Sequence, residues 1–399
     1  MSTSSPFGPL QGVTVADFSQ LAQGPFATQI LGDMGADIIK IEPPKGDWMR
    51  HFALNNLYPG GVSISYLTFN RNKRSVVLDL KNPEGINAAK RLIAKADIVV
   101  ENFRPGVMDR LGLGYEALKQ ENPRLIYCAS CGLGHTGPYV KRPGQDMLIQ
   151  AMSGITMLNG KDGQTPSPAP ISIADLSTGL HIVYTILAAL YSREQTGLGQ
   201  RIDLNLLNSM LTMVLQELNL YLNCGEQARR AKKSIGNPYA GSPYGIYETM
   251  DGFIALGMNP LNLVARLVGA PGYEDISSNN VMEGRDDIHT DLEKCFRRRP
   301  TAEWLEILLA EDVWCGPVYS FADVEKDPQV KENEMIAAFD HPQAGRIRVA
   351  GIPAKFSGTP AAIRRPPPNL GEHTDEILRQ LAGYSDAEIR QLRVVGAVK

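Results

Sequence analysis

One carboxylate, Asp175, occupies a position from which it could act as a nucleophile. The segment 170–181 reads PISIADLSTGLH, so an apolar run of the kind found in strands ends in Asp175, and a long apolar stretch follows. This pattern predicts an acid at the end of a strand, directly before the N-terminus of a helix. The unpaired N–H groups and the dipole of a helix N-terminus favour an ionised carboxylate. Such a carboxylate on a tight turn can act as a nucleophile.

Polar and basic side chains flank two predicted strands elsewhere in the chain. Residues 72–74 (Asn-Lys-Arg) precede a strand predicted at 75–80, and Asn102 and Arg104 follow a strand predicted at 97–101. Lys, Arg and Asn side chains suit a polar ligand that carries phosphates. Each segment alone could be an ordinary surface loop. Their joint placement at strand ends favours a binding site, although these residues do not identify its ligand.

Strand and helix signals alternate over the first 200 residues, and these elements must position the polar side chains. Strands are predicted at 13–18, 37–42, 75–80, 97–101 and 125–130, and helices at 25–34, 83–94, 107–111, 115–121 and 146–153. Short strands separated by helices predict an α/β fold, with a mostly parallel sheet that is covered on both faces. Such sheets bind ligands at the carboxyl ends of their strands.

The pattern changes after residue 200, and we place a domain boundary near Cys224. The remaining predictions are one long helix at 202–223, a smaller α+β unit at 243–324 with a hairpin at 245–256, extended chain rich in Pro and Gly at 326–370, and closing helices at 375–380 and 386–392. The hairpin is predicted from Asp251-Gly252, because an Asp-Gly pair between apolar runs is a strong turn signal.

The composition is that of an ordinary globular protein. Of 399 residues, 43% are hydrophobic and 21% charged, and the net charge of −3 gives no basic field for nucleic acid. Five scattered cysteines do not predict a disulfide framework and favour a reducing compartment. The N-terminus has no signal-peptide pattern, and the apolar stretch 180–191 is shorter than the ~20 residues of a membrane span. We therefore expect a soluble, cytoplasmic protein.

Two short motifs could suggest other chemistry. The run 132–137 matches G-x-G-x-x-G, but prolines follow it and the next helix is predicted only near Asp146, so the dinucleotide site that this motif can mark is not expected. Cys128 and Cys131 form a C-x-x-C within a predicted strand, where they are interpreted as small core residues. No second cysteine pair or histidine spacing completes a metal site, so none is expected.

Taken together, the segments of this chain resemble the family III CoA-transferases, the superfamily of formyl-CoA transferase, carnitine CoA-transferase and α-methylacyl-CoA racemase. The matching stretches occur in order over nearly the whole chain, at 15–25, 35–44, 72–81, 96–112, 146–154, 175–181, 197–200, 315–318 and 371–375. As a set they are highly specific.

The resemblance implies a fold and a set of partners. It implies a large Rossmann-like domain built from residues 1–224 and 331–399, a linker and a smaller α+β domain at 225–330, and a homodimer of two interlocked, ring-like chains. It also implies that an acyl-CoA and a small carboxylic acid are the substrates. Coenzyme A then enters as a substrate and no cofactor is bound permanently. No nucleic acid or membrane partner is implied, and the acyl donor and acceptor stay open.

The resemblance also assigns roles to individual residues. Asp175 becomes the catalytic nucleophile, which forms an aspartyl anhydride and then an aspartyl-CoA thioester. The residues implied in binding CoA are Ala22, Gln23, Leu78, Lys81, Asn102, Phe103, Arg104, Arg110, Gln145 and Asp146. Gly236 and the segment 241–245 are candidates for a mobile loop that shields the intermediates from water.

Two other functions stay open at this point. Racemases of the same superfamily carry a His immediately before an Asp at the position of Gln145-Asp146, and racemisation needs two groups that exchange a proton. Gln145 cannot act as a base, which favours the transferase. A non-catalytic CoA-binding protein is the third possibility, against which the intact Asp175 segment argues.

Overall fold

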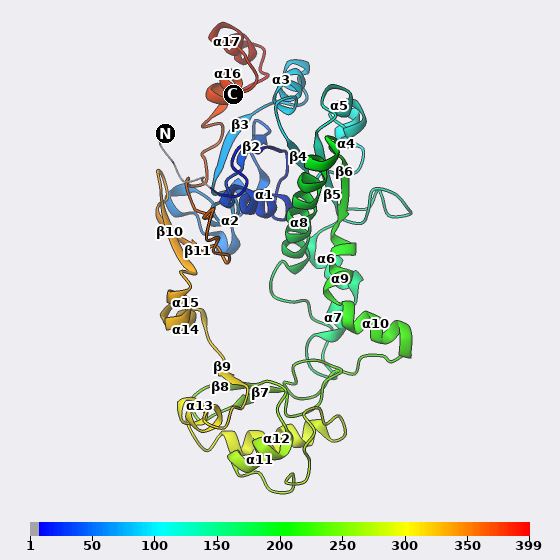
Figure 1. Ribbon diagram of the computed structural model, residues 1–399, viewed down its shortest axis with the longest axis vertical. Coiled ribbons are helices and arrows are strands. Elements are labelled where there is room, and N and C mark those ends of the chain that lie inside the picture. The colour runs from blue at the N-terminus through cyan, green and yellow to red at the C-terminus, as the bar shows by residue number, and fades with distance from the viewer. Residues whose placement is uncertain (1–7) are drawn as a thin grey trace. The chain divides into compact units, whose positions relative to one another are not determined.

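Two compact units make up the computed structural model, which describes residues 8–399 (Figure 1). Unit 1 contains the described residues up to Ile149, Ile171–Met213 and Pro328–Lys399, and unit 2 contains Gln150–Pro170 and Val214–Asp327. Residues 150–170 thus group with unit 2, although the sequence analysis placed them in the large domain.

A six-stranded parallel sheet forms the centre of unit 1. Its strands are β1 (Thr14–Asp17), β2 (Asp37–Glu42), β3 (Lys73–Val77), β4 (Ile98–Glu101), β5 (Ile126–Cys131) and β6 (Arg201–Asn205). They lie in the order β3-β2-β1-β4-β5-β6, and every neighbouring pair is parallel. The predicted parallel sheet is confirmed. The direction in which the chain adds strands reverses between β1 and β4, which is where sheets of this order bind ligands.

Helices cover both faces of this sheet, because the side chains of each strand alternate between the faces. Val15 and Ile38 pack with α1 (Gln23–Asp33) and α8 (Ile173–Thr196). On the opposite face, sheet residues pack with α3 (Pro83–Ile93), α4 (Val107–Arg110), α5 (Tyr115–Glu121), α16 (Thr374–Gln380) and α17 (Asp386–Val394). The last two helices come from the C-terminal end and complete this core, and α16 lies beside β3 (Figure 1).

Shorter elements complete unit 1. They are the 3-10 helices Trp48–Arg50, Leu54–Asn56 and Pro59–Gly61, the helices α2 (Ile64–Phe69), α9 (Leu206–Met213) and α15 (Pro328–Glu332), and the antiparallel hairpin of β10 (Ile336–His341) and β11 (Gly345–Ala350). The helix α6 (Asp146–Ser153) begins in unit 1 and ends in unit 2. Leu67 of α2 packs on Phe339 and Ile347 of the hairpin.

Unit 2 is the smaller α+β unit. Its antiparallel sheet contains β7 (Gly245–Glu248), β8 (Phe253–Leu256) and β9 (Cys315–Pro317), and its helices are α7 (Ile155–Leu158), α10 (Leu215–Cys224), α11 (Leu261–Val268), α12 (Arg285–Phe296), α13 (Thr301–Leu309) and α14 (Phe321–Lys326). Tyr247, Phe296 and Trp304 lie in its core. The predicted hairpin at 245–256 is confirmed as β7 and β8.

Three predictions were wrong. The helix expected at 202–223 is instead strand β6 followed by α9 and α10, because Ile202 and Leu204 alternate toward the core and pair with β5. The extended segment 326–370 contains α15 and the β10–β11 hairpin. The apolar run before Asp175 is not a strand, since α8 already begins at Ile173. For β6 the pairing with β5 decided a segment whose local pattern allowed more than one structure.

Candidate active site

A cavity of about 160 Å³ in unit 1 lies at the carboxyl ends of the central strands. It is lined by the turn after β1 (Leu21, Gln23), the loop after β4 (102–105), the loop after β5 (131–134, Val140, 142–146), Asp175 at the start of α8 and Leu206 at the start of α9. This is the reversal point between β1 and β4, where the two neighbouring loops turn to opposite faces and leave a crevice.

Asp175 enters this cavity from the first turn of α8 and is half-buried. Ser172, the residue before α8, makes no side-chain cap of that helix. Asp146 caps it instead, because its Oδ1 accepts hydrogen bonds from the backbone N–H groups of Ala174 at 2.7 Å and of Asp175 at 3.2 Å. A carboxylate from α6 therefore fixes the backbone that carries Asp175, as an acidic group at a helix N-terminus should.

Asp175 is held as a weaker acid than its helix position alone predicts. Burial, and secondly the charge of Asp146, raise the pKa of Asp175 to about 7. The expected preference of the helix N-terminus for an ionised carboxylate is outweighed here by burial and then by the charge of Asp146, which also accepts hydrogen bonds from the nearest N–H groups. A pKa near the working pH leaves a carboxylate that is partly ionised yet more basic than usual, as functional groups often are.

The turn between β1 and α1 is fixed from two sides. The Asn102 side chain, which follows β4, accepts from Gln20 N at 2.8 Å and donates to Gln20 O at 2.7 Å. Leu21, at a φ of 68°, donates its N–H to Asp47 Oδ1 at 3.2 Å. Ser130 of β5 donates to Gln23 Oε1 at 2.8 Å. The turn after β1 is thus tied to Asn102, which follows β4, and to Ser130 of β5, on the other side of the crevice.

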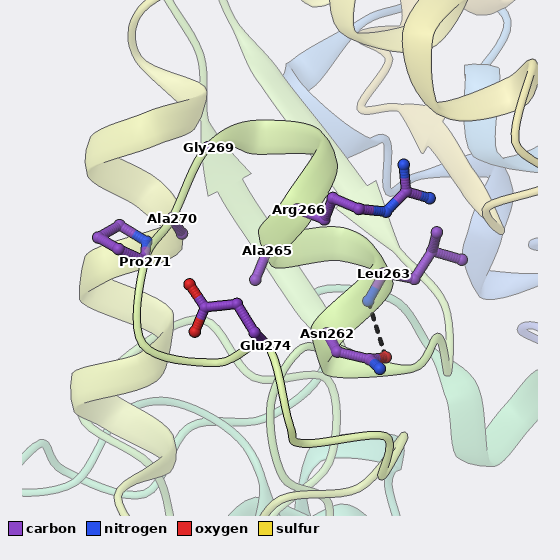
Figure 2. A pocket seen from close by; sticks show the side chains of 8 residues that line it. All are labelled: Asn262, Leu263, Ala265, Arg266, Gly269, Ala270, Pro271 and Glu274. Atoms are coloured by element: carbon purple, nitrogen blue, oxygen red, sulfur yellow. Dashed lines mark hydrogen bonds between the residues drawn. The ribbon is translucent and has the colours of Figure 1, made fainter.

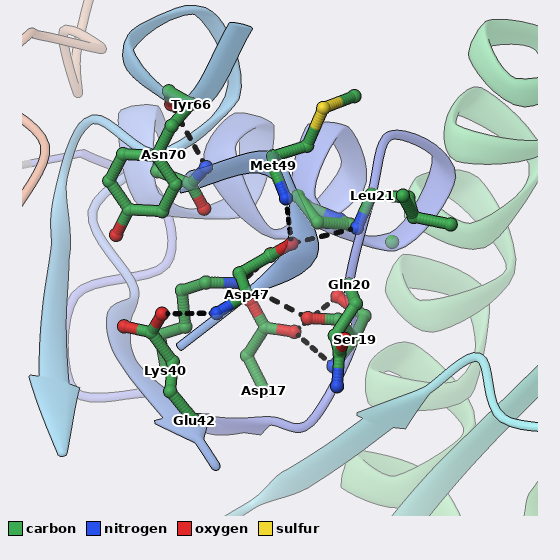
Figure 3. Close-up of polar contacts among 12 residues, drawn as sticks. Asp17, Ser19, Gln20, Leu21, Lys40, Glu42, Asp47, Met49, Tyr66 and Asn70 are labelled. Carbon is green, nitrogen blue, oxygen red and sulfur yellow. Dashed lines mark hydrogen bonds and ion pairs between the residues drawn. The ribbon is translucent and has the colours of Figure 1, made fainter. Parts of the chain in front are cut away.

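A buried ion network lies beneath that turn (Figure 3). Lys40 Nζ donates to Asp47 Oδ2 at 2.7 Å and to Ser19 O at 3.0 Å. Asp17 accepts from Ser19 N at 2.9 Å, from the Ser19 hydroxyl, and from Lys73 Nζ at 3.2 Å. The side chains of the two Asp–Lys pairs are fully buried.

The charges in this network depend on one another. Burial opposes ionisation of Asp17, but Lys73 and Lys40 together hold its pKa below the usual value. Burial lowers the pKa of Lys73 to about 8, although Asp17 opposes that change. A buried ion is tolerated only where its partners stay in place, so the network fixes the carboxyl end of β1 relative to Lys40 within β2 and to Lys73 at the start of β3.

The model of CoA-transferase family III matches residues 10–374 of this sequence. The chain belongs to this family. Human succinyl-CoA:glutarate CoA-transferase is 34% identical and covers 98% of this chain and 90% of the relative. Acetyl-CoA:oxalate CoA-transferase of Acetobacter aceti is 35% identical over 95% of this chain and 97% of the relative. A solved CAIB/BAIF family protein from Brucella suis superposes with a TM-score of 0.83 at 33% identity, covering 94% and 99%.

The resemblance found in the sequence is therefore confirmed, and the chain is a family III CoA-transferase with CoA as the substrate-linked group. The structure brings together seven of the eleven predicted site residues, since the cavity is lined by Gln23, Asn102, Phe103, Arg104, Gln145, Asp146 and Asp175. Their individual roles stay predictions.

The other four predicted residues of the CoA-transferase lie outside the lining of this cavity. Ala22 is buried at the start of α1, and Leu78 is buried in the core just after β3. Lys81 and Arg110 are exposed. β3 is the outermost strand, two strands from the crevice, which separates Leu78 and Lys81 from the cavity.

The loop after β5 contributes residues that the sequence analysis did not assign. Gly132 and Gly144 approach so closely that a Cβ on Gly132 would lie 2.4 Å from the Cα of Gly144. Gly132, the first glycine of the G-x-G-x-x-G match, therefore permits this backbone contact. The contact closes residues 133–143 into a loop with a narrow neck. The first helix after it begins at Asp146, as predicted. Arg142, near the neck, lines the cavity. In the sequence, the glycines were the only feature that pointed to this loop.

The candidate shielding loop lies in unit 2 and is packed there. Ser242 and Val281 exchange two backbone hydrogen bonds, at 3.1 and 3.0 Å. A Cβ on Gly241 would lie 2.1 Å from Val281 O, and one on Gly236 would lie 2.4 Å from the Tyr244 ring. These glycines are thus required by close packing, and a shielding role for them stays a prediction.

Unit 2 also contains a hollow of about 650 Å³ beside α11 (Figure 2). Arg266 and Glu274 are the ionisable residues among the eight that line it. Both charged side chains already have partners: Arg266 pairs with Glu311 at 3.2 Å, and both carboxylate oxygens of Glu274 accept from the N–H of Gly272. The cavity of Asp175 is therefore the candidate active site. No metal-holding group of His, Cys, Asp or Glu occurs within residues 8–399.

The buried network can be tested by stability. Lys73→Met leaves Asp17 with a weakened set of partners, so we expect the free energy of unfolding to fall by about 3–5 kcal/mol, as for other broken buried pairs. In the double variant Asp17→Asn/Lys73→Met, the free energy of unfolding should fall by less than the sum of the losses in the two single variants, because both charges are removed. Urea titrations followed by fluorescence measure the four values. Additive losses would contradict the coupling.

The raised pKa of Asp175 has a stability consequence with a definite sign. Its folded pKa of about 7 exceeds the ordinary value of 3.8. The folded chain therefore holds this proton more tightly than the unfolded chain, and stability is lost as pH rises from about 4 to 7. Asp175→Asn should raise the melting temperature more at pH 8 than at pH 5, measured by calorimetry. Asp275→Asn, at an exposed site, is the control, and an equal effect of Asp175→Asn at both pH values would refute the assignment.

Proposed function

We propose that the enzyme moves CoA from an acyl-CoA to a carboxylic acid through covalent intermediates on Asp175. The Asp175 carboxylate attacks the thioester carbonyl, which forms a mixed anhydride and releases CoA thiolate. The thiolate attacks the Asp175 carbonyl, giving an aspartyl-CoA thioester and the donor acid. The acceptor carboxylate repeats these two steps in reverse, so CoA leaves on the acceptor and Asp175 is regenerated. Two easier steps replace each difficult exchange.

The observation that carries this proposal is the position of Asp175. It lines one cavity together with Phe103 and Arg104 of the loop after β4, at the reversal point of the sheet. The guanidinium of Arg104 suits the phosphates of CoA. Asp146 fixes the Asp175 backbone and helps to keep the carboxyl basic. A basic, oriented carboxylate is what attack on a CoA thioester needs.

The names of the relatives support a class of substrates. The human relative is named for succinyl-CoA and glutarate, and that of Acetobacter aceti for acetyl-CoA and oxalate. We propose small acyl-CoA donors and small carboxylic acid acceptors for this chain, with no resident cofactor. The resemblance to the family supports an interlocked homodimer as its assembly.

We also propose a cytoplasmic location without a membrane partner. Within residues 8–399, α8 is the one helix long and apolar enough to cross a membrane by length and composition. It is longer, at 24 residues, than the apolar stretch in the sequence suggested. Half of its most apolar window is buried, and it packs on α1 and the sheet of unit 1. This burial supports a core helix.

The transferase proposal predicts that Asp175→Ala abolishes CoA exchange. Without the carboxylate neither the anhydride nor the thioester intermediate can form. Transfer between succinyl-CoA and a panel of carboxylic acids is followed by mass spectrometry of the CoA esters. In the natural sequence, acyl-CoA with hydroxylamine should leave a modification on the peptide that contains Asp175. Normal turnover by Asp175→Ala would refute the mechanism.

A racemase is the second candidate, because a carboxyl group with a pKa of about 7 also suits proton transfer. Gln145 lines the cavity where that reaction would need a second base. We therefore expect that a 2-methylacyl-CoA incubated in deuterated water gains no deuterium at Cα, as measured by mass spectrometry. Deuterium uptake at catalytic rates would favour the racemase over the transferase.

A further inference from the structure

We propose that Arg142 binds the second carboxylate of a dicarboxylic acid whose first carboxylate reacts at Asp175. This inference rests on the proposed function and names the acceptor class for the same site. Both side chains line the cavity at the carboxyl ends of the central strands. When one carboxylate of a dicarboxylic acid reacts at Asp175, the second carboxylate stays charged and needs a cation beside it.

The loop after β5 holds Arg142 at the edge of this cavity. The backbones of Gly132 and Gly144 touch, so the loop closes two residues beyond Arg142. Beyond that neck, α6 begins with Asp146, whose carboxylate accepts from the N–H of Asp175 at 3.2 Å. Only three residues therefore separate Arg142 from Asp146, the residue that orients the nucleophile.

The Arg142 guanidinium is oriented but carries no ion pair. The guanidinium lies 4.0 Å from the centre of the Tyr139 ring, and the backbone N–H of Arg142 donates to the backbone carbonyl of Tyr139 at 2.9 Å. Among the residues that the structure describes, no carboxylate pairs with this guanidinium. The side chain is exposed. Stacking on an aromatic face leaves the edge of a guanidinium, with its paired N–H donors, available to a carboxylate.

The charges that line the cavity leave this role to Arg142. Its lining contains two cations, Arg104 and Arg142, and two acids, Asp146 and Asp175. Asp146 is engaged by the N-terminus of α8, and the proposed function assigns Arg104 to CoA and Asp175 to the reaction. Arg142 is the remaining charge. A planar, bidentate donor is the side chain that best matches a carboxylate.

The experiment measures isotopic exchange between an acid and its own CoA ester, so that each reaction contains a single acid. Labelled glutarate exchanges with glutaryl-CoA, and labelled butyrate, which lacks the second carboxylate, exchanges with butyryl-CoA. We expect Arg142→Gln to lower the ratio of kcat/KM for glutarate to that for butyrate about 10- to 100-fold, the size of a lost charged hydrogen bond. Arg142→Lys should restore part of the ratio, since it keeps the charge but not the bidentate geometry.

Two controls separate this role from others. Lys141→Gln removes the same charge from the neighbouring exposed residue, which does not line the cavity, and should leave the ratio unchanged. Calorimetry with free CoA should give the same Kd for Arg142→Gln as for the natural sequence.

The outcomes are distinct. An unchanged ratio in Arg142→Gln, an equal loss for both acids, weaker CoA binding, or a natural enzyme that exchanges butyrate alone would each overturn the role of Arg142. Failure of the natural enzyme to exchange either acid, or unimpaired exchange by Asp175→Ala, would instead overturn the proposed function.

Discussion

The carboxylate of Asp17, buried at the end of the central strand β1, is the constraint on which the site depends. It accepts from Lys73 of β3, from Ser19 of the following turn and from Thr28 of α1. A buried charge is expensive unless all its partners stay in place, so these contacts fix the turn after β1. Lys40 and Asp47 extend the same network to Leu21 at the rim of the cavity.

The cavity exists because the sheet reverses its order between β1 and β4. The turn after β1 and the loop after β4 diverge there, and the Asn102 side chain bridges them through the backbone of Gln20. The loop after β5 and the start of α8 then close the crevice from the side. Segments that are more than 150 residues apart in the sequence, such as Leu21 and Asp175, meet through this topology.

Asp175 illustrates how an environment changes the chemistry of a residue. A position in the first turn of a helix favours a strong acid, but Asp146 occupies the N–H groups that would produce that effect. Burial and the charge of Asp146 then make Asp175 a weak acid. Asp146 therefore both orients the backbone of Asp175 and raises the pKa of its carboxyl group. This combination places a basic carboxylate in the cavity at the carboxyl ends of the central strands.

The sequence by itself determined the family and the parallel sheet, and it singled out Asp175 as the candidate nucleophile. Ile98, Val99 and Val100 are all buried, so the continuous apolar run in the predicted strand 97–101 identifies this strand without tertiary information. Local pattern could not decide β6, because the segment 201–205 becomes a strand only by pairing with β5. It also could not give the pKa of Asp175 or the place of Arg142. Both depend on groups brought close by the fold: Asp146 beside Asp175, and the backbone contact between Gly132 and Gly144.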